Sequence, residues 1–168
     1  MIASPSSGDA QHTPYERLAA LGLSLPPPME PIANFASYVL EGSMLYLSGQ
    51  GPIHPDGRSH QGKVGTDVSA SEAYEHARIT GLNLIALMHA ALGDLSRVRR
   101  IVKVLGMVNA APTFRDHPAV INGCSDLFVS VFAERGVHAR SAVGFSSLPN
   151  GITVEIEAIV AIDSGEKP

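Results

Sequence analysis

The sequence predicts a single α+β domain, in which two helices cover one face of a mixed β-sheet. Three observations predict this fold class. Strand-like and helix-like segments follow one another in the order β-β-α-β-α-β-β. The strand-like segments are rich in β-branched residues, whereas the helix-like segments carry apolar residues at helical spacing. The chain has 168 residues, of which 45% are hydrophobic, and this is enough for one core of ordinary size.

Composition divides the chain into one domain and three shorter parts. Residues 1–13 are rich in Ser, Gly, Pro and Ala, which predicts a flexible N-terminus. Residues 14–33 form an N-terminal extension that includes the extended run "LPPPMEP", Leu25–Pro31. A single domain spans 34–163, and 164–168 form a C-terminal tail.

Local signals place the individual elements. Two β-rich pieces joined by residues 41–43, Glu-Gly-Ser, predict a hairpin. Ser69 and Glu72 have the spacing of a capping box, and Gly93 ends the helical pattern that follows. A second long helix begins near Asp116. We expect strands at 37–40, 44–48 and 98–108, a closing hairpin within 138–160, and helices at 15–23, 69–92 and 116–136.

The expected closing hairpin carries one arginine and two glutamates among apolar residues. Side chains alternate between the two faces of a strand, so Glu155 and Glu157 share the face away from the helices. If Val143 and Phe145 point into the core, Arg140 lies on the same outer face, opposite Glu157. Two interpretations stay open: a cross-strand salt bridge on a half-exposed sheet, or an arginine fork that binds a ligand carboxylate.

Few charges limit the classes of function. Charged residues make up 17% of the chain and the net charge is -4. The one basic cluster, within 97–103, predicts a solvent-exposed strand edge without interleaved aromatic residues, so we expect no nucleic-acid partner. A low charge fraction also indicates that another subunit covers part of the surface.

Cysteine, histidine and hydropathy patterns give three further expectations. Cys124 is the single cysteine and predicts a packed helix residue, with no internal disulfide. The seven histidines lack the spacing of metal ligands, so we expect no metal site, with His54 and His60 solvated in a loop and His138 in a turn. No stretch approaches the roughly 18 apolar residues of a membrane span. We therefore expect a soluble cytoplasmic protein without membrane contact.

Four motifs together resemble a known family. They are "LYLSGQGPI", "VNAAPTF", "VINGCSDLF" and "HARSAVGFSSLPNGITVEIEAIVAI", and the similarity extends from about residue 34 to residue 162. These motifs are similar to those of the YjgF or Rid (reactive intermediate deaminase) family, also called L-PSP endoribonucleases. The resemblance implies a chorismate-mutase-like fold and a homotrimer, in which the sheets line an inner barrel and ligand clefts lie between subunits.

The resemblance also implies a reaction and a site. The reaction is hydrolysis of 2-aminoacrylate and related imines to 2-keto acids and ammonia, and it needs no cofactor. By motif position, Arg140 would bind the substrate carboxylate and Glu155 would activate the attacking water. The other residues expected to line the substrate pocket are Phe35, Ser48, Asn122 and Ala142.

Two positions depart from the pattern of the family. The frequent cysteine after "ARS" is Ala142 here, so only the backbone of that residue can contact the substrate. The frequent cleft tyrosine corresponds to Phe35, which keeps the aromatic ring without its hydroxyl. Two other functions therefore stay open beside the deaminase: a non-catalytic trimer that binds small carboxylates, and a ribonuclease or translation inhibitor.

Overall fold

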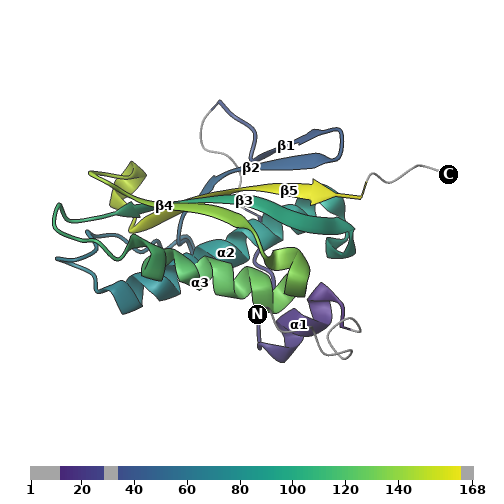
Figure 1. Ribbon diagram of the computed structural model, residues 1–168, viewed down its shortest axis with the longest axis horizontal. Coiled ribbons are helices and arrows are strands. Elements are labelled where there is room, and N and C mark those ends of the chain that lie inside the picture. Colours follow the sequence, from purple (N-terminus) through teal and green to yellow (C-terminus); the bar gives the residue numbers. More distant parts are fainter. Residues whose placement is uncertain (1–11, 29–33, 164–168) are drawn as a thin grey trace, which may run out of the picture.

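The computed structural model describes residues 12–28 and 34–163 of the chain. In this part, a five-stranded sheet has the strand order β1-β2-β5-β3-β4. Two long helices, α2 and α3, lie side by side on one face of the sheet, whereas the described elements leave its other face without a helix (Figure 1). The elements are α1 (Pro14–Ala20), β1 (Tyr38–Glu41), β2 (Met44–Gln50), α2 (Ala70–Leu92), β3 (Val98–Asn109), α3 (His117–Phe132), β4 (Ala139–Phe145) and β5 (Val154–Ile162), with 3-10 turns at Leu95–Arg97, Ala133–Gly136 and Pro149–Gly151.

The predicted α+β class and the order of its elements are confirmed. Ser69 and Glu72 form the expected capping box at the start of α2, and Gly93 ends that helix in the left-handed conformation. The second long helix is shorter than predicted, because α3 ends at Phe132 and a 3-10 turn continues to Gly136. The flexible N-terminus predicted at 1–13 and the tail at 164–168 lie outside the described residues, except for residues 12 and 13.

Part of the N-terminal extension packs on the domain. Its helix α1 is close to the predicted range, and Leu18 is buried in the common core. The hydroxyl of Tyr15 accepts a hydrogen bond of 2.9 Å from the backbone N–H of Leu95. The same hydroxyl lies 2.9 Å from Nδ1 of His89, near the end of α2. These contacts attach α1 to the end of the helical layer.

The predicted closing hairpin is wrong, because β3 lies between β4 and β5. Helix α3 crosses over from β3 to β4, and the connection makes these two strands parallel. Residues 146–153 then carry the chain to the other edge of β3, where β5 pairs with it antiparallel. Arg140 is therefore opposite Val104 and not opposite Glu157.

The register also corrects the face on which Arg140 lies. Val104 pairs with both Arg140 and Ala158, and Val104 is fully buried beneath the helices. Met107 pairs with both Val143 and Glu155. Paired residues of neighbouring strands share a face. Arg140 thus lies on the helix-covered face, whereas Glu155 lies on the open face with Val143, which we expected in the core.

Small residues let α3 approach the sheet closely. A Cβ atom at Gly106 of β3 would lie 2.6 Å from side-chain atoms of Ile121, which is too close for an unstrained contact. A Cβ at Gly144 of β4 would collide with the ring of His117. The absence of side chains at these two positions sets how near α3 lies to β4 and to the arginine on it.

We predict that Gly106→Ala lowers the free energy of unfolding by about 1–3 kcal/mol, because the added methyl group overpacks the contact with Ile121. Chemical denaturation measures this cost. In the double variant with Ile121→Ala the clash is removed, so the combined cost should be clearly smaller than the sum of the two single costs. Additive costs would contradict the close contact.

Candidate functional site

Arg140 extends from β4 toward α3 and is held by polar groups of that helix. Its Nη1 atom donates hydrogen bonds of 2.8 Å to Oδ1 of Asn122 and 3.0 Å to Oγ of Ser125. Its Nη2 atom donates a longer bond of 3.4 Å to the carbonyl of Pro118. Asn122 and Ser125 are three residues apart, so they lie on one face of α3. We call Arg140, Asn122 and Ser125 the arginine half-site.

One edge of the Arg140 guanidinium is available to a ligand. Both N–H groups of Nη1 have acceptors. Within the described residues, the N–H group of Nε donates no hydrogen bond, and no carboxylate lies within salt-bridge distance of the guanidinium. The N–H groups of Nε and Nη2 form a parallel pair that matches a carboxylate. The half-site can therefore bind a carboxylate bidentately through that edge.

Glu155 lies on the open face against the part of β2 that follows Ser48. A Cβ atom at Gly49 would collide with the carboxylate of Glu155, so the backbone of β2 lies directly against this side chain. The hydroxyl of Ser48 donates a 2.7 Å bond to the carbonyl of Ala36, next to Phe35. The side chain of Phe35 is 49% exposed. We call Phe35, Ser48, Gly49 and Glu155 the glutamate half-site.

The carboxylate of Glu155 is a better base than an ordinary glutamate. Partial burial raises its pKa, and the negative charge of Glu157 raises the pKa further. Glu157 lies on the same open face, two residues along β5. We expected Glu157 to hold either Arg140 or a neighbouring chain in place. The first role is excluded within one chain, because the two residues lie on opposite faces of the sheet, and the charge of Glu157 acts on Glu155.

The structure brings some predicted site residues together and separates others. Asn122 contacts Arg140, and Ala142 lies on the same face of β4, half-buried against the core. Ser48 and Phe35 belong to the segments that adjoin Glu155. The two half-sites, however, lie on opposite faces of the sheet, so the described part of one chain does not place Arg140 and Glu155 around one ligand.

The open face also exposes apolar side chains. Val39 and Tyr46 share it with Ile159, since these residues pair across β1, β2 and β5. Val143 and Phe145 of β4 lie on it as well. The exposed fractions are 51% for Val39, 43% for Tyr46, 39% for Val143 and 41% for Phe145. The described part of the open face thus carries several exposed apolar side chains.

Sequence reasoning missed one residue of each half-site and one cluster of histidines. Ser125 and Gly49 carry no distinctive signal in the sequence, although Ser125 follows Asn122 by one helical turn.

His54 and His60 were expected in solvent, but their Nε2 atoms lie 2.8 Å apart. The ring of His60 also stacks on the ring of His76, with centroids 3.9 Å apart. Burial, with a smaller contribution from the neighbouring His60, lowers the pKa of His76 to about 4, so this ring is neutral near pH 7.

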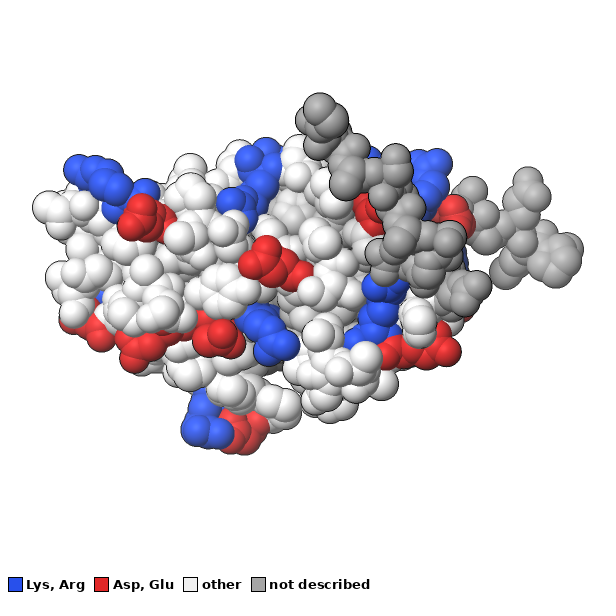
Figure 2. All heavy atoms as spheres, turned by 60° about the horizontal axis from the view of Figure 1, so that its bottom comes forward, with Lys and Arg blue, Asp and Glu red and all other residues white. Residues whose placement is uncertain are grey.

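Other groups of the described chain offer little chemistry. The described residues contain no group of three or more side chains arranged to hold a metal ion. The thiol of Cys124 is buried, and burial raises its pKa, so it is not a nucleophile. No helix in the described ranges is long and apolar enough to cross a membrane. On the face seen in Figure 2, acidic and basic side chains are interspersed and much of the surface is uncharged.

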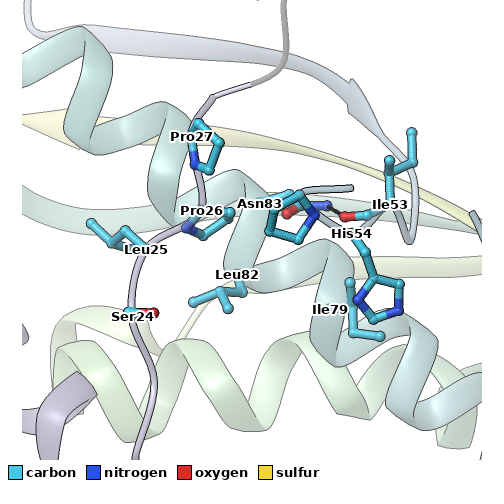
Figure 3. A pocket seen from close by; sticks show the side chains of 10 residues that line it. Ser24, Leu25, Pro26, Pro27, Ile53, His54, Ile79, Leu82 and Asn83 are labelled. Atoms are coloured by element: carbon cyan, nitrogen blue, oxygen red, sulfur yellow. Dashed lines mark hydrogen bonds between the residues drawn. The ribbon is translucent and has the colours of Figure 1, made fainter. Parts of the chain in front are cut away.

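A pocket of about 310 Å³ lies apart from both half-sites (Figure 3). One wall comes from the N-terminal extension, at Leu25 and Pro26, and the others come from the segment 53–55 and from α2. Asn83 of α2 donates bonds from Nδ2 to the carbonyls of Gly51 and Ile53, which joins that segment to the helix. The pocket is mainly apolar, and His54 is the one titratable side chain among the described residues that line it.

Comparisons with known proteins agree with this architecture. The family model described as "YjgF/chorismate mutase-like, putative endoribonuclease" matches residues 15–154. Protein TCP17 of Trypanosoma cruzi is 43% identical over 148 residues, which cover 88% of this chain and 92% of the relative. A 2-iminobutanoate/2-iminopropanoate deaminase of Dermatophagoides farinae is 30% identical over 146 residues, which cover 84% of this chain and 95% of that protein. A solved "putative endoribonuclease" from Shewanella oneidensis is 34% identical, with a TM-score of 0.87, and the match covers 90% of this chain and 100% of that structure.

We predict that Glu157→Gln lowers the pKa of Glu155 toward its ordinary value, because the nearby negative charge is removed while partial burial remains. A carboxyl-carbon NMR titration of the wild type and the variant measures the change. Glu134→Gln, at an exposed position in the turn after α3, is the matched control and should leave the pKa of Glu155 unchanged. An unchanged pKa in Glu157→Gln would show that the two carboxylates do not interact.

Proposed function

Because the chain belongs to the YjgF/chorismate mutase-like family, we propose that it is an imine deaminase that hydrolyses 2-aminoacrylate-type intermediates to 2-keto acids and ammonia. The observation that carries the proposal is the Arg140 guanidinium, which α3 holds on one side while its Nε edge is available to a carboxylate. The deaminase of Dermatophagoides farinae, at 30% identity, supports this substrate class.

The reaction requires positioning of the substrate and proton transfers to and from one carboxylate. The carboxylate of the imino acid binds Arg140, which orients the imine carbon. Glu155 accepts a proton from water as the water oxygen bonds to that carbon and the C=N electrons move to nitrogen. The protonated Glu155 returns this proton to nitrogen, which gives a carbinolamine. Glu155 then takes the proton of the new hydroxyl and delivers it to nitrogen as the oxygen electrons form the carbonyl and the C–N bond breaks, which releases ammonia and the 2-keto acid. The raised pKa of Glu155 suits a group that both accepts and donates this proton.

A second copy of the chain would complete the site. Arg140 and Glu155 lie on opposite faces of one sheet, so two copies are needed to place both groups around one ligand. The exposed apolar residues of the open face give such an assembly a surface to bury. We extend the proposal to a homotrimer, with each cleft formed by the arginine half-site of one subunit and the glutamate half-site of its neighbour.

The deaminase proposal predicts that the protein accelerates release of pyruvate from freshly generated 2-aminoacrylate. Arg140→Ala should raise KM about tenfold or more, because a charged hydrogen-bond partner of the carboxylate is lost. Glu155→Gln should lower kcat about 100-fold, because the variant cannot accept the proton. Steady-state kinetics measure both, with Arg99→Ala at an exposed position of β3 as the control.

Three results would contradict the proposal in different ways. No acceleration over buffer would contradict deaminase activity. If a 2-keto acid then still stabilised the wild type but not Arg140→Ala against heat, the protein would be a non-catalytic carboxylate binder. RNA cleavage that depends on Arg140 and Glu155 would instead favour a ribonuclease.

The shared cleft predicts complementation between two impaired variants, assayed at a substrate concentration far below KM. When Arg140→Ala and Glu155→Gln subunits are unfolded together in equal amounts and refolded, about a quarter of all clefts receive both intact groups, and that share of activity should return. Refolding each variant alone is the control and should restore no activity beyond that of the variant itself. If the mixture is no more active than the separate variants, the site is not shared between subunits.

A further inference from the structure

The arginine half-site is connected to a half-buried histidine, His138, that the proposed mechanism does not use. Nε2 of His138 lies 3.0 Å from Oγ of Ser125, and Nδ1 of His138 lies 2.6 Å from the carbonyl of Gly136. The same Ser125 hydroxyl accepts the bond from Nη1 of Arg140. These contacts form one continuous chain from the 3-10 turn after α3, through His138 just before β4 and Ser125 of α3, to the guanidinium on β4.

The direction of every bond in this chain is determined by chemistry. A carbonyl can only accept, so Nδ1 of His138 carries the ring proton that is donated to Gly136. Nε2 of the neutral ring is then an acceptor, and the Ser125 hydroxyl donates to it. Arg140 can only donate, so it needs the lone pairs of Ser125, and donation to His138 turns those lone pairs toward it.

The groups around the His138 ring favour its neutral form and hold the ring in place. Burial lowers its pKa; the bond to Gly136 acts in the opposite direction, and the positive charge of Arg140 lowers the pKa again. Among the described residues, Arg140 is the charged group that faces the ring. The ring of Phe128 packs edge-on against the imidazole, with centroids 5.9 Å apart. A neutral ring in a fixed position preserves the acceptor at Nε2.

We infer that His138 and Ser125 are positioning residues, which orient the Arg140 guanidinium so that its Nε and Nη2 edge faces the substrate carboxylate. The inference rests on the proposed carboxylate-binding role of Arg140. Asn122 and Ser125 hold both N–H groups of Nη1 and so fix the plane of the guanidinium. His138 contributes through Ser125 and does not touch the substrate.

The hydrogen-bond chain has a spectroscopic signature that does not depend on activity. In the ¹⁵N-labelled wild-type protein near pH 7, two-bond ¹H–¹⁵N correlations of the imidazole should show His138 as the neutral tautomer with the proton on Nδ1. A ring that carries its proton on Nε2, or that is doubly protonated at this pH, would overturn the inference, because Ser125 would then have no acceptor at Nε2.

Binding of benzoate, a stable carboxylate probe, tests the positioning role. By calorimetry, Ser125→Ala should weaken benzoate binding about fivefold or more, because a hydrogen bond that orients a charged donor is lost. Ser130→Ala is the matched control, since Ser130 also lies on α3 and its hydroxyl bonds only to the carbonyl of Asp126. In the deaminase assay, Ser125→Ala should raise KM by a similar factor and change kcat by less than about twofold.

Two substitutions of His138 separate positioning from simple packing. His138→Gln can place an amide oxygen near the position of Nε2 and should keep most of the affinity for benzoate. His138→Asn retains a donor near Nδ1 but has no acceptor that reaches Ser125, so it should behave like Ser125→Ala. If both variants bind benzoate equally, the acceptor at Nε2 has no role and the inference fails.

Failure of this inference is distinguishable from failure of the proposed function. If Arg140→Ala abolishes benzoate binding while Ser125→Ala binds as tightly as the wild type, only the positioning role is wrong. If neither Arg140→Ala nor Ser125→Ala changes benzoate binding, Arg140 is not a carboxylate anchor and the proposed function fails with it. If benzoate binding depends on Ser125 but no deaminase activity is found, the positioning role stands in a carboxylate-binding protein.

Discussion

The pairing of β3 with β4 on one side and with β5 on the other is the constraint on which both half-sites depend. The α3 crossover makes β3 and β4 parallel, and it places the helix directly over β4. That placement brings Asn122 and Ser125 within hydrogen-bond distance of Arg140. On the other side of β3, the register of β5 turns Glu155 to the open face. One central strand thus separates the arginine from the glutamate.

The sequence predicted the element types and the first hairpin correctly, but it did not predict the pairing of the last two strands, for physical reasons. Caps and periodicity are local, so the helix that starts after Ser69 and ends at Gly93 could be placed before the structure was known. Pairing is a long-range property, and two consecutive strands with a plausible loop need not be neighbours. The faces of β5 were predicted correctly, because Glu155 and Glu157 alternate with buried residues. The faces of β4 were not.

The error in β4 comes from the size of its side chains. Val143 and Phe145 were expected in the core because they are large and apolar, yet they lie on the open face. The helix-covered face carries Ala142 and Gly144, because α3 comes so close that His117 occupies the space of a side chain at Gly144. Close helix packing thus reverses the usual relation between size and burial on this strand. Large apolar residues are left for a surface that another subunit covers in the proposed trimer.

Electrostatics in a single chain leave both half-sites incomplete. Among the described residues, Arg140 has only uncharged acceptors, so its positive charge is not neutralised. Glu155 has the opposite problem, because partial burial and Glu157 disfavour its ionised form. Since the folded state raises this pKa, ionisation of Glu155 costs stability as the pH rises through the raised value. A carboxylate ligand at Arg140 supplies the missing negative charge, and a neighbouring guanidinium in the proposed cleft would favour ionised Glu155. The charges of Arg140 and Glu155, which the described part of the isolated chain leaves uncompensated, are therefore the ones that an assembled and occupied site would stabilise.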